Sequence, residues 1–195
     1  MNANNIEVEL KFKVSDKPCL LAWLEANAKL ESQNRQIDDY YTPSHRNFFE
    51  KEFPDEYLRI RRSGTKASIA YKMLHTTGDN KQYSHCDEYE TGVENVDQVE
   101  KIFLAMDLKL VVTVDKNRSS YQYRNFEIEV DDVVDVGTVC EIEIKGEYES
   151  VAEAHKQICD FAEVLGFSDN DRGGDMKLGY AHMLMKKKAL LVQQL

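Results

Sequence analysis

Features that would tie the chain to a membrane or to nucleic acid are missing from the sequence. The first residues contain neither the basic segment nor the apolar core of a signal peptide. No apolar run approaches the length of a transmembrane helix. Lysine and arginine number 25 against 35 aspartates and glutamates, so the formal net charge is −10. Because nucleic acids and anionic membranes attract surplus positive charge, we expect no binding to either.

Cysteines in a metal-binding arrangement are also missing. The four cysteines, Cys19, Cys86, Cys140 and Cys159, form no CxxC pair, which argues against a zinc site. Cys140 alternates with charged residues in a predicted strand, and Cys159 lies in a predicted helix. We therefore expect reduced cysteines that serve packing, as in a cytoplasmic protein.

What the sequence does contain is the composition of a folded, soluble protein. Hydrophobic residues make up 42% and charged residues 31% of the chain. A length of 195 residues is enough for a domain with a substantial core, and no linker interrupts it. We predict a single domain over residues 1–195 that ends in a helical segment at about 178–191.

The N-terminal segment 6–14 predicts a β-strand with one apolar and one charged face. Glu7, Glu9, Lys11 and Lys13 alternate with aliphatic and aromatic residues. Because successive side chains of a strand point to opposite faces, these four charges stand in one row.

Similar charged rows return along the chain. They are Arg59 and Arg61; Lys72; Glu88 and Glu90; Lys116 and Arg118; Glu127, Glu129 and Asp131; and Glu141, Glu143 and Lys145.

The sequence also predicts the other strands and the helices. Further strands are predicted at 37–42, 57–62, 66–74, 83–93, 110–117, 119–123, 125–130 and 138–144. Helices are predicted after a cap at Ser15 or Asp16, at 96–108, and from the capping box at Ser150 to Leu165.

The charged rows must face water, because an unpaired charge in a dry core is strongly unfavourable. They could face bulk solvent, as charged rows usually do. Alternatively, the apolar faces pack against helices and the charged faces line the wet interior of a closed barrel, which also removes exposed sheet edges. The two halves of the chain each carry a charged strand followed by a helix, which is compatible with a sheet that closes on itself.

A barrel interior of this kind would suit a metal-bound polyphosphate. Carboxylate oxygens are the hard ligands that Mg²⁺ and Mn²⁺ prefer. Arginine and lysine side chains bind phosphate oxygens. The spacing of the rows alone leaves the solvent-facing arrangement equally open.

The segment Glu7-Val8-Glu9-Leu10-Lys11 resembles the ExExK signature of the CYTH superfamily, also called the triphosphate tunnel metalloenzymes. The later charged rows follow in the order of that superfamily, and the likeness extends from Ile6 to about Leu184. Within it, the opening strand and the segments 116–121, 130–133 and 141–142 resemble the class IV adenylyl cyclase group most.

The resemblance implies an α+β fold, with a closed antiparallel β-barrel (a tunnel) of about eight strands, helices packed outside and dependence on Mg²⁺ or Mn²⁺. It implies catalytic roles for Glu7, Glu9 and Lys11; triphosphate binding by Lys11, Arg59, Arg61, Lys72, Lys116 and Arg118; metal binding by Glu7, Glu9, Glu129, Asp131, Glu141 and Glu143; and further tunnel acids at Glu88 and Glu90. A homodimer is also compatible with the resemblance. Lys13, Glu127 and Lys145 lie near strand ends and stay outside the predicted site.

Two reactions fit such a tunnel. As a class IV-type adenylyl cyclase, the protein would convert ATP to cyclic AMP and pyrophosphate. As a triphosphatase, it would hydrolyse tripolyphosphate, thiamine triphosphate or a nucleoside triphosphate, and Arg61, Glu88 and Glu90 look like features of such members. A third alternative is a module that binds polyphosphate or a nucleotide without turnover. The segment 46–55 is either a cover over the tunnel mouth or an ordinary loop.

Overall fold

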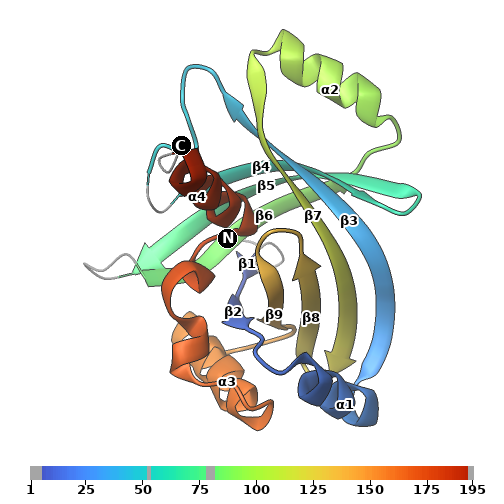
Figure 1. The fold of residues 1–195 in the computed structure, drawn as a ribbon, viewed down its shortest axis with the longest axis vertical. Helices are drawn as coiled ribbons and strands as arrows, with labels where there is room; N and C mark the ends of the chain where they lie inside the picture. Colours follow the sequence, from blue (N-terminus) through green and yellow to red (C-terminus); the bar gives the residue numbers. More distant parts are fainter. Residues whose placement is uncertain (1–5, 52–53, 78–81, 193–195) are drawn as a thin grey trace.

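The computed structural model describes residues 6–51, 54–77 and 82–192, which contain nine strands and four α-helices (Figure 1). The strands are β1 (Ile6–Glu7), β2 (Glu9–Lys13), β3 (Lys29–Pro43), β4 (Glu56–Ser63), β5 (Lys66–Thr77), β6 (Gln82–Gly92), β7 (Leu108–Tyr123), β8 (Phe126–Val133) and β9 (Gly137–Ile144). The helices are α1 (Lys17–Asn27), α2 (Val96–Ala105), α3 (Val151–Val164) and α4 (Tyr180–Val192), and the 3₁₀ turns η2 (Asp169–Arg172) and η3 (Gly174–Lys177) precede α4. None of the described helices is both long and apolar enough to cross a membrane.

All nine strands form one antiparallel sheet that returns on itself. Their order is β1-β6-β5-β4-β3-β7-β8-β9-β2, so the two outermost strands are consecutive parts of the N-terminal segment. β1 pairs with β6 and β2 pairs with β9, and Val8 between them accepts a backbone hydrogen bond from Ile144. The predicted antiparallel barrel is therefore confirmed as a nearly closed one. The predicted first strand at 6–14 is divided at Val8, because its two parts pair with different neighbours.

Two strands are longer than the sequence indicates. β3 begins at Lys29, eight residues before the predicted start, and β7 is continuous where two strands were predicted. Residues 29–35 are exposed and, apart from Leu30, polar, so they carry no apolar alternation. They are strand because they pair with β7, from Lys29 opposite Gln122 to Gln36 opposite Lys116. The strand conformation of this segment therefore comes from its pairing with β7 and not from a local sequence pattern.

The helix ends follow local chemistry. The side chain of Asp16 accepts a hydrogen bond from the backbone N–H of Cys19 and starts α1, as predicted. The Ser150 hydroxyl accepts from the N–H of Glu153 at the start of α3, but the Glu153 carboxylate reaches the N–H of Glu149 instead of closing the capping box. α2 ends at Ala105, three residues before the predicted boundary, and Asp107 just beyond it has a φ of 58°. Of the polar segment 76–82, in which Gly78, Asp79 and Asn80 predict a loop, residues 78–81 lie outside the described part of the chain.

Three helices lie on the outer face of the barrel, as predicted. The apolar sides of β2, β8 and β9 form one core with α1 and α3, in which Phe12, Ile128, Ile142 and Ile158 are buried. α2 covers Tyr41 and Ile60 through Phe103. The alternation of apolar and charged residues thus sends the apolar faces outward, against helices.

The fourth helix differs from that expectation. α4 packs against Val112 and Val114, which share the inward face of β7 with Lys116 and Arg118, and it lies within the curve of the sheet (Figure 1). Phe48 and Phe49 from the 46–55 segment are buried in the same cluster. One end of the barrel is therefore filled by α4 and apolar side chains, because the inward face turns from charged to apolar along β7.

Candidate triphosphate site inside the barrel

The charged rows of the strands face a single cavity of about 540 Å³. The predicted site residues on its wall are Glu7, Glu9, Lys11, Arg59, Arg61, Lys72, Glu88, Glu90, Lys116, Arg118, Glu129, Glu141 and Glu143. Asp131, the remaining predicted residue, is fully buried behind this wall. The arrangement with the rows facing bulk solvent, which the spacing had left open, is thus wrong for these residues.

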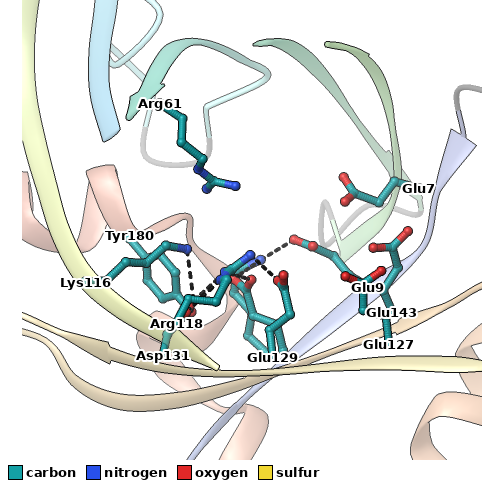
Figure 2. Close-up of polar contacts among 12 residues, drawn as sticks. Glu7, Glu9, Arg61, Lys116, Arg118, Glu127, Glu129, Asp131, Glu143 and Tyr180 are labelled. Atoms are coloured by element: carbon teal, nitrogen blue, oxygen red, sulfur yellow. Dashed lines mark hydrogen bonds and ion pairs between the residues drawn. The ribbon is translucent and has the colours of Figure 1, made fainter. Parts of the chain in front are cut away.

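Arg118 is the centre of the most buried ion-pair group. Its guanidinium bonds to both oxygens of Asp131, with Nε 2.7 Å from Oδ1, and it also pairs with Glu129 and Glu141 (Figure 2). Burial by itself would lower the pKa of Arg118, but the three carboxylates raise it well above its usual value. Burial raises the pKa of Glu129 to about 7, although Arg118 opposes this. The group therefore packs three carboxylates around one permanently charged cation.

Asp131 also binds two further side chains. Nζ of Lys116 donates to Oδ2 over 3.0 Å, and the Tyr180 hydroxyl of α4 donates to the same oxygen over 2.9 Å (Figure 2). Nζ of Lys116 also lies 4.9 Å from the centroid of the Tyr180 ring. Burial and the neighbouring Arg118 lower the pKa of Lys116 to about 8. The predicted metal ligand Asp131 is thus occupied by protein donors in this structure.

A second set of ion pairs lies across β4, β5 and β6. Arg59 donates to Glu90 over 2.8 Å and lies 3.6 Å from Glu88, and Nζ of Lys72 is 2.6 Å from Glu7 and 3.2 Å from Glu88. Arg59 is nine-tenths buried, and its Nε has no hydrogen-bond partner among the described residues. A buried N–H without an acceptor is unfavourable, so a ligand oxygen at this point would be bound favourably.

Arg61 is held by a residue that the sequence did not point to. Asp38 of β3 accepts two hydrogen bonds of 2.7 Å from Arg61, from Nε and Nη2. Burial would raise the pKa of Asp38, but Arg61 and Arg59 hold it far below its usual range. The sequence indicates only that Asp38 lies on a predicted strand. That it faces Arg61 depends on the register between β3 and β4, which the sequence does not show.

Glu7, Glu9 and Glu143 gather on one wall, which we call the acidic wall, with Glu127 beside them (Figure 2). Burial, then the charge of Glu7, raises the pKa of Glu143 to about 8. Crowded carboxylates of this kind are the donor set that a hard divalent cation would stabilise. No cluster of three or more His, Cys, Asp or Glu in the described residues already converges on one point as metal ligands would. The chemistry of the acidic wall fits Mg²⁺ or Mn²⁺, and binding would draw its carboxylates together.

Several cavity residues were not predicted. Lys145, which the sequence places near a strand end and outside the predicted site, lines the cavity and pairs with Glu143 and Glu127. Tyr40, Tyr57 and Tyr180 add aromatic surface, and Arg172 and Lys177 enter from the segment before α4. Tyr40 is largely buried and also lines the cavity. Lys145 continues the alternation of Glu141 and Glu143, so its place in the cavity could have been predicted from the sequence. Arg172 and Lys177 lie outside the strands, so no alternation indicates that they reach the cavity.

Comparison with known proteins identifies the family of this chain and shows that its fold is shared. The CYTH domain family matches residues 5–172. A protein of Methanocaldococcus jannaschii named putative adenylate cyclase is 30% identical over 139 residues, which are 71% of this chain and 76% of that protein.

Two solved structures share the fold. A protein of Vibrio parahaemolyticus with the same kind of name has a TM-score of 0.75 and 18% identity, over 93% of this chain and 98% of its own. A Hippeastrum protein, named putative adenylyl cyclase and described as having a dominant triphosphatase activity, has a TM-score of 0.59 and 15% identity, over 86% of this chain and 91% of its own.

Proposed function

The chain belongs to the CYTH domain family, and we propose that it is a metal-dependent enzyme that converts ATP to cyclic AMP and pyrophosphate. The observation that carries this proposal is the convergence of six cationic side chains from four strands on one cavity. They are Lys11 of β2, Arg59 and Arg61 of β4, Lys72 of β5, and Lys116 and Arg118 of β7. A chain of phosphates is the ligand whose charge and length match such a row.

The acidic wall supports a role for a divalent cation. Glu7, Glu9 and Glu143 would hold it, and Glu129, Asp131 and Glu141 would contribute if the phosphate chain took over their present cationic partners. A bound Mg²⁺ or Mn²⁺ would neutralise phosphate charge and lower the pKa of an attacking hydroxyl. Pure anion binding needs few carboxylates, so this acid content favours an enzyme over a binding module.

A nucleotide fits the cavity better than an inorganic triphosphate does. About 540 Å³ lies within the range of cavities that hold drug-sized ligands. Apolar and aromatic side chains form part of the wall: Ile6, Leu10, Tyr40, Ala70, Leu74 and Leu178. An inorganic phosphate chain would gain nothing from such contacts, whereas a nucleoside would bury apolar surface against them. The name of the M. jannaschii relative points to the same substrate.

In the cyclisation, the ribose 3′ oxygen attacks the α-phosphorus, its proton passes to a carboxylate of the acidic wall, and pyrophosphate leaves. Lys11, between Glu9 and Glu141, and Arg118 are placed to hold phosphate oxygens while charge moves to the leaving group. These cations are buried and already oriented by carboxylates, so their side chains need to move little to stabilise the transition state. Positioning and electrostatics would supply most of the catalysis.

Hydrolysis of a triphosphate is the second candidate. Its support is the wet acidic surface on β6, where the Glu88 and Glu90 side chains are 20% and 43% exposed within reach of Arg59. Water has access there and could attack the terminal phosphorus. The activity described for the Hippeastrum protein supports the same alternative.

Product analysis distinguishes the candidates. Purified protein with Mg²⁺ or Mn²⁺ is supplied with ATP and, separately, with tripolyphosphate. Cyclic AMP and pyrophosphate in equal amounts support the cyclase, and orthophosphate supports the triphosphatase. If the protein binds triphosphates but converts none, it is a binding module and the proposal is wrong.

The variant Glu9→Ala tests the role of the acidic wall. We expect at least a hundredfold loss of turnover with ATP affinity nearly unchanged, because Glu9 serves the reaction and not the grip on the phosphates. Glu147→Gln, which removes an exposed carboxylate away from the cavity, is the control and should keep full activity.

A further inference from the structure

The segment between α3 and α4 contributes two cations to the cavity from outside the strands. Arg172 ends η2 and Lys177 ends η3, and both line the cavity with Met176, Leu178 and Gly179. This position is fixed by packing, because η2 and η3 lie against β2 and the Tyr57 ring lies directly beside Gly179. Lys177 lies beyond residues 5–172, the part of the chain that the CYTH family matches.

These two side chains differ from the cations on the strands in how their charge is balanced. Each of the cavity cations Lys11, Arg59, Arg61, Lys72, Lys116, Arg118 and Lys145 is paired with at least one carboxylate that is no more than half exposed. Lys177, by contrast, has no ion pair within the described part of the chain.

Arg172 is almost as free of carboxylates. Its Nη1 donates to the sulfur of Cys159 over 2.8 Å. The one described carboxylate within ion-pair range is Asp169, at 3.5 Å, and that side chain is 97% exposed. An ion pair so open to water is worth little, so the positive charge of Arg172 remains available to a ligand.

We propose that Arg172 and Lys177 bind the terminal phosphate of the triphosphate and so make the site selective for triphosphates over diphosphates. The inference rests on the proposed function, whether cyclase or triphosphatase. The inner phosphates must compete with carboxylates for the strand cations. The terminal phosphate carries the highest charge of the chain, close to −2 at neutral pH. It therefore gains most from cations that no protein carboxylate neutralises.

The test compares ATP with ADP. Binding of each nucleotide, with Mn²⁺, is measured by calorimetry for the wild type and for Arg172→Met, Lys177→Met and the double variant. We expect ATP affinity to fall about tenfold for each lost charge-assisted contact. ADP affinity should change less than twofold, so that the preference for ATP shrinks. Lys109→Met, which removes an exposed lysine outside the cavity, should change neither affinity.

Further variants separate recognition from structure. Arg172→Lys keeps the charge and should restore most of the lost ATP affinity, while thermal unfolding checks that the contact with Cys159 is not needed for folding. Equal losses for ATP and ADP, or no loss for ATP, would overturn the inference while leaving the proposed function intact. If the wild type binds neither ATP nor tripolyphosphate, the proposed function fails, and the inference fails with it.

Discussion

The hydroxyl of Tyr180 donates a hydrogen bond to Oδ2 of Asp131 over 2.9 Å, which ties α4 to β8 inside the barrel. Asp131 is completely buried, so the loss of any hydrogen bond to its carboxylate is unfavourable. We predict that Tyr180→Phe lowers the free energy of unfolding by about 1–3 kcal/mol, the usual range for losing a bond to a charged buried group. Urea denaturation measures this, with Tyr89→Phe, an exposed tyrosine, as the control. An unchanged urea midpoint would mean that the hydrogen bonds from Lys116 and Arg118 alone satisfy the Asp131 carboxylate.

Arg118 should be the most sensitive cation for folding. Replacing it by methionine leaves Glu129, Asp131 and Glu141 buried with fewer positive partners. We predict a loss of about 3–5 kcal/mol in the free energy of unfolding, as when one partner is removed from a buried ion pair. The matched control is Arg35→Met, since Arg35 also forms a two-bond pair, with Asp115, but at the surface. Comparable losses for the two variants would contradict the importance given to burial.

A histidine group outside the cavity should make stability depend on pH. The His85 ring stacks on His75 at 4.5 Å, its Nδ1 lies 3.0 Å from the Ser84 hydroxyl, and His155 of α3 donates to the Ser84 carbonyl. Burial, then the charge of His75, lowers the pKa of His85; burial also lowers that of His155. Asp87, which bonds to His75, opposes the shift of His85.

The sign of the effect follows from these lowered values. Below about pH 6.5 the unfolded chain takes up protons that the folded chain resists. The stabilisation present above that pH is lost as the pH falls toward the folded-state pKa values. Glu129 and Glu143, whose pKa values burial raises, contribute in the opposite direction over the same range, so we predict the histidine contribution alone. Compared with the wild type, His85→Gln should raise the free energy of unfolding at pH 5 relative to its value at pH 7. Denaturant titrations across the range measure both slopes; His45→Gln, in an exposed loop, should leave the slope unchanged.

Gly179 should tolerate no side chain without movement of its neighbours. A Cβ at this position would lie 2.9 Å from the hydroxyl oxygen of Tyr57 and 3.1 Å from its Cζ. Because the Tyr57 ring is buried, Gly179→Ala should cost about 1–3 kcal/mol of stability. Removing the hydroxyl in the double variant Gly179→Ala, Tyr57→Phe should restore part of it. Gly92→Ala, where the nearest atom is 4.0 Å away, is the control. A fully additive double variant would show that the crowding is unimportant.

Much of the barrel could be predicted from alternation. Glu7, Glu9 and Lys11 alternate with Val8 and Leu10, and a strand places such residues on opposite faces whatever its partners are. The same rule placed Arg59, Arg61, Lys116 and Arg118 on inward faces. The first half of β3 could not be predicted because residues 29–35 are polar apart from Leu30 and show no alternation, and only pairing with β7 makes them a strand.

Which side chains share a strand face follows from the amino-acid order, since side-chain direction alternates along the backbone of each strand. Which cations meet which carboxylates depends on how distant segments pack together. Asp38 faces Arg61 through strand register, α4 brings Tyr180 to Asp131, and the turns before α4 carry Arg172 and Lys177 to the cavity. These contacts cannot be predicted from local sequence patterns, because they depend on packing between segments far apart in the chain.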